Sequence, residues 1–400
     1  MSVLLILLLV SFPLGHLVRL EVAQGIAVYP NDLIAGLMAM VVIAKALKTK
    51  SLPKAKLTYP IVLFSLVAAL SLLQGSRTVE LPELMTGSLY LLRWMLLTAV
   101  YFFTLTLPIE RGLKVLRTTV SYEEVLLLSG LSLAALGIVQ YVIFPDMTQF
   151  KWIGWDDHAF RLVGTLLDPG FTGIILVLTA LLAMRLSEPK PVKIAAVTLS
   201  TLALLLTYSR SSYLAFLAGF LVFGWMIKKL GKALLGIFLF LLFLVFLPKA
   251  ASEGTNLLRQ YSFFNRVETW EHAAVMIRDH PALGVGFNLL RYAQKRYHYL
   301  GEDWKTSHSG AGVENSYLFI LVTTGIIGGS AFAWLIYKIN KLWLAGSERG
   351  GTGKALGLAS LAALATHGVF NNSWFYPWVL VWMWMLIALK EATLRKKPSA

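Results

Sequence analysis

The sequence predicts an all-α polytopic membrane protein, with about 12 transmembrane helices and one large helical loop outside the cytoplasm. Of its 400 residues, 57% are hydrophobic and only 14% are charged, and the mean hydropathy is +0.68. Soluble domains carry about 25% charged residues. The apolar residues form continuous blocks close to the roughly 20 residues that a helix needs to cross a bilayer. A β-barrel would instead show short alternating segments.

The apolar blocks give the predicted spans, in chain order. The first block resembles the apolar part of a signal peptide, but it lacks a basic region before it and a small-residue cleavage site after it. We therefore interpret it as an uncleaved first span. The spans are expected near residues 2–18, 31–47, 58–74, 84–107, 123–144, 169–187, 191–208, 211–227, 233–248, 315–337, 354–370 and 374–390.

The basic residues predict the orientation of the spans. Alternate connections and the C-terminal tail hold 22 of the 36 Lys and Arg residues, and such connections face the cytoplasm. Both termini are then cytoplasmic. The net charge of +15 is thus a topology signal rather than a nucleic-acid-binding patch. The chain has no cysteine, which excludes disulfides and thiolate metal sites.

This layout divides the chain into three regions. Residues 1–248 hold helices 1–9, residues 249–314 form the extracytoplasmic loop, and residues 315–400 hold helices 10–12 and a basic tail. Within the loop, "NRVETWEHAAVMIRDHP" predicts a helix with Asn265 as its N-cap and Pro281 after its end. "GVGFNLLRYAQKRYHYL" predicts a second short helix. Its glycines are interpreted as turn residues, because no βαβ pattern surrounds them.

Three arginines at the outer ends of spans are candidate ligands for an anion. Arg210 lies in "TYSRSSYLAFL", Arg161 precedes "GTLLDPG", and Arg266 begins the predicted loop helix, where its charge opposes the helix dipole. The guanidinium fork matches phosphate oxygens. The simpler interpretations are a snorkelling or capping role for Arg210, a surface-loop position for Arg161 beside an N-cap at Asp168, and solvent exposure for Arg266.

A carboxylate stands at the outer start of the tenth span. Glu314 precedes Asn315 in "ENSYLFILVTTGIIGG". It is either an interfacial carboxylate beside a capping asparagine or a reactive group. Arg93, within the fourth span, and His367, near the outer end of the eleventh, are interpreted as structural polar groups. The acidic and histidine residues, including His308, show no recognisable metal-ligand spacing.

Four motifs in order carry a resemblance to a known family. They are "RLVGTLLDPGFTG", "TYSRSSYLAFL", "NRVETWEHAAVMIRDHPALGVGF" and "ENSYLFILVTTGIIGG". Together they resemble the O-antigen ligase and polymerase superfamily of bacterial envelope glycosyltransferases, over residues 161 to 329. The resemblance implies a GT-C-like, inverting, metal-independent hexosyltransferase that needs no cofactor. It also implies a site on the periplasmic face of the bacterial inner membrane, and a donor glycan joined through diphosphate to undecaprenol.

The resemblance also assigns roles to residues. Arg210 and Arg266 match the arginines that bind the donor diphosphate, and Arg161 matches a further arginine of that kind. Glu314 occupies the position where lipid-A-core ligases usually carry His, and a carboxylate can accept the acceptor's proton there. Arg291 is expected to contact the sugars, together with Trp304 and other aromatic residues of the loop, whose simpler role is an interfacial belt.

Glutamate instead of histidine at position 314 favours a polymerase that extends the lipid-linked glycan of an O-antigen or another surface polysaccharide. The first alternative is a ligase that transfers the glycan to lipid A-core or another acceptor. A lipid-linked-sugar flippase is the alternative from another class. Transporters often place binding charges near mid-membrane, whereas the candidate charges of this chain are expected on the outer side. The expected partners are the lipid-linked donor, a glycan or lipid acceptor, membrane lipids and, for a polymerase, a chain-length regulator. Nucleic acid is not expected.

Overall fold

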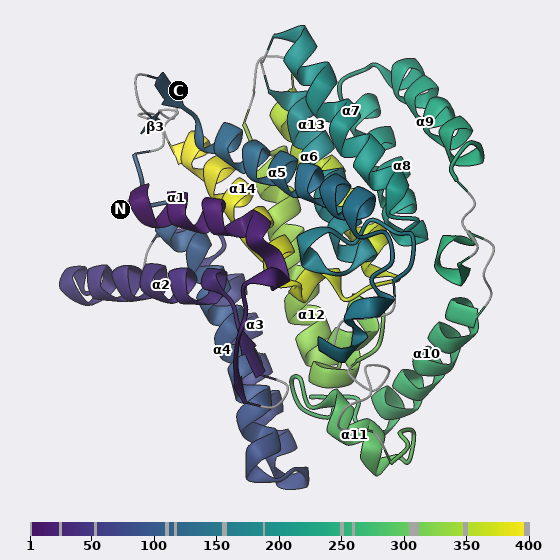
Figure 1. The fold of residues 1–400 in the computed structure, drawn as a ribbon. Coiled ribbons are helices and arrows are strands. Elements are labelled where there is room, and N and C mark those ends of the chain that lie inside the picture. The colour runs from purple at the N-terminus through teal and green to yellow at the C-terminus, as the bar shows by residue number, and fades with distance from the viewer. Residues whose placement is uncertain are drawn as a thin grey trace.

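The computed structural model places most of the chain in helices. The described residues are 2–23, 26–51, 54–108, 112–115, 118–153, 158–186, 189–248, 252–257, 261–302, 304, 312–346 and 351–395. Figure 1 shows the helices packed around one another, with two short hairpins. The described α-helices are α1 (Ser2–Ser11), α2 (Pro30–Thr49), α3 (Thr58–Gly75), α4 (Leu81–Thr104), α5 (Tyr122–Ile143), α6 (Pro169–Arg185), α7 (Lys190–Leu206), α8 (Arg210–Met226), α9 (Leu230–Val245), α10 (Tyr261–Asp279), α11 (Leu290–Arg296), α12 (Ser316–Leu344), α13 (Thr352–Gly368) and α14 (Pro377–Arg395).

Short elements join these helices. The strands form two antiparallel hairpins, β1–β2 and β3–β4. Their bounds are Leu20–Ala23 for β1, Ile26–Val28 for β2, Leu113–Val115 for β3 and Thr118–Val120 for β4. The described 3₁₀ turns are η1 (Phe12–Leu17), η2 (Ser76–Thr78), η4 (Thr148–Ile153), η5 (Gly164–Leu166), η6 (Glu253–Thr255) and η8 (Ser373–Phe375).

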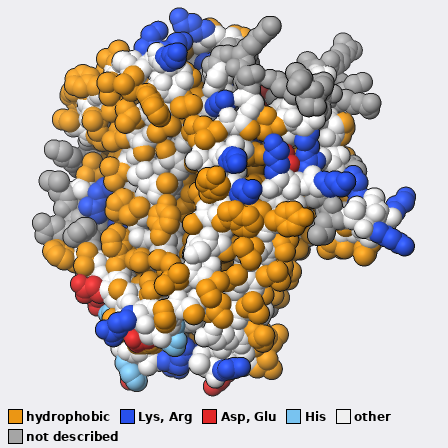
Figure 2. All heavy atoms as spheres, turned by 180° about the vertical axis from the view of Figure 1, so that it is seen from behind, with side chains coloured by type: hydrophobic (Ala, Val, Ile, Leu, Met, Phe, Trp, Pro, Cys, Tyr) orange, Lys and Arg blue, Asp and Glu red, His pale blue; other side chains and the backbone are white. Residues whose placement is uncertain are grey.

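Each of the predicted spans coincides with a helix, so the all-α class of the fold is confirmed. Among the described residues, five helices are long and apolar enough to cross a membrane: Thr58–Thr78, Leu81–Thr104, Tyr122–Ile143, Ser316–Leu344 and Pro377–Arg395. Shorter apolar helices cover Ser2–Leu17, Pro169–Arg185, Arg210–Met226 and Leu230–Val245. Figure 2 shows hydrophobic side chains over much of the middle of one face. These features indicate an integral membrane protein, whereas the count of 12 spans stays a prediction.

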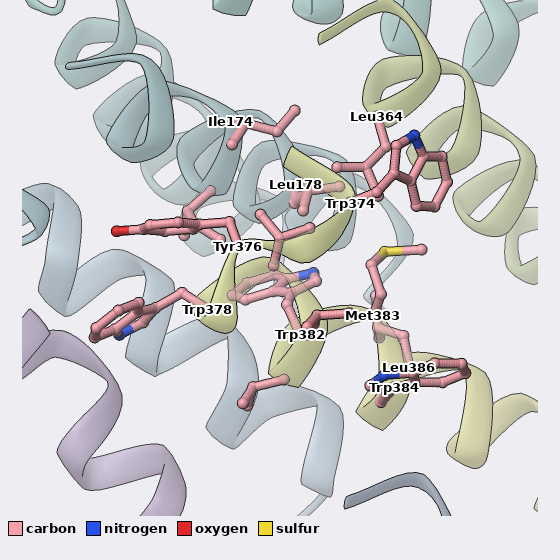
Figure 3. Packing of buried hydrophobic residues seen from close by; sticks show 14 of the residues in the cluster. Ile174, Leu178, Leu364, Trp374, Tyr376, Trp378, Trp382, Met383, Trp384 and Leu386 are labelled. Atoms are coloured by element: carbon pink, nitrogen blue, oxygen red, sulfur yellow. The ribbon is translucent and has the colours of Figure 1, made fainter. Parts of the chain in front are cut away.

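The core lies where α6, α13 and α14 meet. Helices that are apolar on all sides are buried inside a bundle, and both α6 and α14 bury residues around most of their circumference. Trp378 and Trp382 of α14 are 1% and 0% exposed. Figure 3 shows the α14 side chains together with Ile174 and Leu178 of α6 and Leu364 of α13. Helix α13 also packs along α8, so the helix that begins with Arg210 rests on this core.

The loop predicted over residues 249–314 contains the two expected helices, with one different boundary. Helix α10 ends at Asp279, before Pro281, and α11 covers Leu290–Arg296, as predicted. Helix α10 already begins at Tyr261, however, so Asn265 is not its N-cap and Arg266 does not stand at its start. An N-cap needs a non-helical backbone, and the helix runs through "YSFF" before it reaches Asn265. The dipole argument for Arg266 therefore does not hold.

A break in α12 anchors the loop to the helical core. Gly325 has a φ of +64°, which divides α12 into two helical parts. The segment 281–286 pairs its backbone with the interrupted turn, through Val285 N to Val322 O (2.9 Å), Gly286 N to Thr323 O (3.2 Å), Ile326 N to Pro281 O (2.8 Å) and Ile327 N to Ala282 O (3.2 Å). Buried backbone groups need such partners at a helix break. Gly284 and Gly286 have positive φ and are turn residues, as predicted.

Candidate functional site

A pocket of about 430 Å³ collects most of the predicted site residues. It lies between α10 and three other parts of the chain. These are the start of α6, the start of α8, and Glu314, which precedes the N-cap of α12 at Asn315. Helix N-termini carry partial positive charge and favour anions. The pocket is lined by His158, Arg161, Asp168, Pro169, Gly170, Ser209, Arg210, Ser211, Leu214, Arg266, Val267, Trp270, Glu314, Phe370 and Asn371.

A tight turn between two apolar helices places Arg210 at the pocket. Helix α7 ends at Leu206 and α8 begins at Arg210, as the "YSRSS" pattern predicted. Tyr208 adopts a φ of +50° in this turn, and the hydroxyl of Ser209 caps α8. The Nη1 of Arg210 donates to the carbonyl of Leu257 at 3.4 Å. The charges of Arg210 and Arg266 are close enough to repel each other, so an anion between them would be stabilised.

Arg161 is a buried wall of the pocket rather than a surface-loop residue, and that simpler interpretation of the sequence is wrong. Its side chain donates from Nε to Thr207 O at 3.0 Å and from Nη2 to Tyr208 O at 3.3 Å. The residue is 8% exposed. The terminal carbonyls of a helix lack partners within it. Arg161 supplies donors to the carbonyls that follow α7 and so stabilises the end of that helix. The accompanying prediction of an N-cap at Asp168 is confirmed, because its Oδ1 accepts from Phe171 N at 2.7 Å.

An ion pair links the loop to the start of α12. The Nε of Arg266 lies 2.6 Å from Oε2 of Glu314. The side chain of Glu314 is 61% exposed, whereas that of Arg266 is 22% exposed. Asn315 supplies the helix cap, since its Oδ1 accepts from Tyr317 N at 2.9 Å and Leu318 N at 3.0 Å. The carboxylate of Glu314 is therefore not needed for capping and faces the pocket.

The contact between Arg266 and Glu314 is short but poorly aligned. The buried Nε of Arg266 has no hydrogen-bond acceptor of suitable geometry within the described residues, although the carboxylate oxygen is within ion-pair distance. Distance decides the Coulomb attraction and angle decides the hydrogen bond, so the contact is an ion pair without a well-formed hydrogen bond at Nε. The guanidinium group thus keeps the capacity to bind a better-placed oxygen.

Arg291 does not line this pocket. It lies on α11, and its Nη1 donates to the carbonyl of Trp304 at 3.4 Å. The Nζ of Lys295 lies over the ring of Trp304, 4.0 Å from its centroid, and the same ring packs edge-on against Tyr292. Attraction of a cation to an aromatic face holds this cluster together. Arg291 and Trp304 therefore belong to a second, aromatic part of the loop.

The two predicted structural groups are confirmed. Arg93 pairs with Asp32 at 2.8 Å and donates to Ala27 O, so it joins α4 to α2. His367 is 0% exposed and has hydrogen-bonding partners on both ring nitrogens. His308, which was considered for a metal site, lies outside the described residues. In the described part of the chain, no three His, Asp or Glu residues gather as a metal site would require.

Sequence reasoning did not select Ser211, Asn371 or Trp270 for the pocket. Trp270 of α10 lines the pocket beside Arg266. Ser211 follows Arg210 directly, and this proximity was the available signal. Asn371 lies four residues after His367 in the link to α14, and its Nδ2 donates to Ser211 Oγ at 2.8 Å. That contact joins residues 160 positions apart, and no local sequence pattern predicts a contact over such a separation.

The arrangement of charges suits a polyanion. Three guanidinium groups and two carboxylates line the pocket, so its formal charge is about +1 if His158 is neutral. An incoming phosphate would meet arginine forks, hydroxyl groups and helix starts together. The exposed carboxylate of Glu314 stands beside these groups in an ion pair with Arg266, and a carboxylate is a group that can accept a proton from a second reactant.

Comparison with known protein families finds a match that covers part of the chain. Residues 195–333 match the family model described as O-antigen ligase. A search of the curated proteins finds no match. The matched residues run from within α7 into α12 and include Arg210, Arg266, Arg291 and Glu314, whereas Arg161 precedes them. The resemblance of the sequence to the O-antigen ligase and polymerase superfamily is thereby confirmed.

Proposed function

From that family match, we propose that the chain is an inverting membrane glycosyltransferase that polymerises oligosaccharide units carried on polyprenyl diphosphate. One observation carries the proposal: Arg161, Arg210, Arg266 and Glu314, from four separate parts of the chain, line a single pocket. The proposed location is the bacterial inner membrane, with both termini in the cytoplasm and the pocket at the periplasmic face.

In this proposal the arginines hold the donor. Arg210 and Arg266 bind the diphosphate oxygens, and their mutual repulsion is relieved when the anion lies between them. The unaligned Nε of Arg266 gains a hydrogen-bond acceptor. Arg161 supports this diphosphate-binding position chiefly by fixing the end of α7, through its hydrogen bonds to Thr207 and Tyr208. The charge that grows on the leaving diphosphate is stabilised by the same groups, so no metal ion is required.

Glu314 is the proposed general base. The ion pair with Arg266 occupies one oxygen of this carboxylate. A diphosphate would compete for Arg266 and release the carboxylate. Glu314 then takes the proton of the acceptor hydroxyl, the acceptor oxygen attacks the anomeric carbon, and the bond from that carbon to the diphosphate oxygen breaks. The lipid diphosphate leaves with the electron pair, and the anomeric configuration inverts.

The acceptor decides between polymerase and ligase. Glutamate at position 314, where the ligases usually carry histidine, favours a polymerase whose acceptor is another lipid-linked glycan. The aromatic cluster of Arg291, Trp304 and Tyr292 supports this reading as a place for sugars, since aromatic faces pack against sugar rings. A ligase that uses lipid A-core or another acceptor is the second candidate, and the family match favours it equally.

Product analysis with a defined donor tests the proposal. The full-length protein is reconstituted in liposomes with one lipid-linked repeat unit and no other acceptor. Formation of longer glycans on the lipid, with release of polyprenyl diphosphate, supports the polymerase. Transfer only after lipid A-core or another acceptor is added supports the ligase. Movement of the donor across the bilayer without glycosyl transfer would support a flippase and contradict both.

A further inference from the structure

Beneath the pocket lies a buried hydrogen-bond network that the proposed mechanism does not use. His367 of α13 is its centre and is 0% exposed. Its Nε2 lies 3.3 Å from Ser211 Oγ and 3.2 Å from Ser212 Oγ, and its Nδ1 lies 2.6 Å from Ser373 Oγ. Asn371 adds a donor, with its Nδ2 2.8 Å from Ser211 Oγ. Ser211 and Asn371 line the pocket, whereas His367 does not.

The buried hydroxyl of Ser373 decides which ring nitrogen carries the proton. Ser373 is 0% exposed, and Nδ1 of His367 is the only side-chain hydrogen-bonding partner of its Oγ among the described residues. If Nδ1 were protonated, the hydroxyl hydrogen of Ser373 would have no acceptor, and a buried donor left unsatisfied is unfavourable. If Nδ1 accepts from Ser373, both groups are satisfied. Nε2 then carries the hydrogen and donates toward the serines of α8.

This tautomer determines what Ser211 can offer to a ligand. A serine hydroxyl has one hydrogen and two acceptor positions. At Ser211, Asn371 Nδ2 and His367 Nε2 are both in place to fill the acceptor positions. The neighbouring Ser212 sends its own hydrogen to Gly170 O at 3.0 Å. Ser211 is therefore left with its hydrogen, which can reach Ser209 Oγ at 3.2 Å or a ligand in the pocket.

We propose that His367 is a positioning residue that makes Ser211 a hydrogen-bond donor to a phosphate oxygen at the floor of the pocket. The chain of donation runs from Ser373 to His367, from His367 to Ser211, and from Ser211 to the anion. The opposite tautomer would draw the hydrogen of Ser211 toward the imidazole and present lone pairs to the ligand, which repel an anion. This inference rests on the proposed function, because it assumes that the pocket receives a diphosphate.

Binding of farnesyl diphosphate to the full-length protein in nanodiscs tests this role without requiring turnover. Ser211→Ala is expected to weaken binding about tenfold to 100-fold, which corresponds to one hydrogen bond to a charged group. His367→Leu should weaken it to a similar extent. His367→Gln should stay within about twofold of wild type, because its amide can still donate toward Ser211. His298→Gln, on an exposed part of the loop, is the matched control.

A double-mutant cycle separates positioning from general stability. If His367 acts through Ser211, His367→Leu has no further effect on binding once Ser211 is alanine. Equal weakening by His367→Leu in both backgrounds would overturn the inference. Ser373→Ala keeps the imidazole but removes the group that selects its tautomer, so it replaces His367→Leu in the test if that variant fails to fold. Ser373→Ala should weaken binding, and unchanged binding would also overturn the inference.

The same assay distinguishes failure of the inference from failure of the proposed function. If wild type binds the probe and Arg210→Ala abolishes binding, but the Ser211 and His367 variants bind as wild type, only the role of His367 is rejected. If wild type itself binds no farnesyl diphosphate, the proposed donor site and the inference are both rejected.

Discussion

Arg266 on α10 and Glu314 before α12 form an ion pair, with 2.6 Å between Nε and Oε2. The two residues are 48 positions apart, and both line the pocket that also contains Arg210. The pair combines a group suited to hold a diphosphate with a group suited to accept a proton. Donor binding and base activation are thus linked in the proposed mechanism, because one requires Arg266 and the other requires that Glu314 be released from it.

Replacement of Glu314 by Gln should abolish most glycan transfer. The amide keeps the size of the side chain but cannot accept the acceptor's proton, and loss of a general base typically costs about 10²–10⁴-fold in rate. The measurement is polymer formation from lipid-linked repeat units in liposomes. Glu268→Gln, an exposed residue on α10, is the control and should act as wild type. Wild-type turnover by Glu314→Gln would exclude this residue as the essential base.

Replacement of Arg210 by Lys should impair donor use. Lysine keeps the positive charge but cannot reproduce the planar fork that binds two phosphate oxygens. We expect the KM for the lipid-linked donor to rise about tenfold or more, the loss of roughly one charged hydrogen bond. Expression and thermal stability should change little. The same substitution at Arg278, which is 77% exposed on α10, is the control, and an equal KM for the two variants would argue against a donor contact.

Replacement of Arg161 by Ala should affect stability as well as activity. Arg161 is buried and satisfies two carbonyls at the end of α7. Removal leaves those carbonyls short of donors, which costs about 1–3 kcal/mol for each unsatisfied group. The midpoint of thermal unfolding in detergent should fall, whereas the exposed control Arg77→Ala should leave it unchanged. A normal midpoint together with a raised donor KM would instead place Arg161 in direct contact with the donor.

The sequence predicted the helices well because each apolar block is a property of neighbouring residues. It also selected Arg161, Arg210, Arg266 and Glu314, which do share a pocket. It could not predict that Asn371 reaches Ser211, because this contact depends on how α8 and α13 pack. The start of α10 was misplaced for a related reason: a capping pattern is local and does not outweigh a helix that already continues through it.

The break in α12 offers a test of how the loop is held in place. Gly325 has a φ of +64°, and a Cβ there would lie 2.2 Å from the carbonyl oxygen of Ala282. Gly325→Ala must therefore adopt a positive-φ backbone that is almost restricted to glycine, at a cost of about 1–3 kcal/mol, and it must also displace the segment 281–286. We expect a lower thermal midpoint and faster proteolysis of the outer loop. Gly36→Ala is the control, because a Cβ at Gly36 meets nothing within 4 Å, and alanine favours its helix. If both variants unfold at the wild-type temperature and the loop is equally resistant to protease, the pairing between the loop and the broken helix does not hold the loop in place.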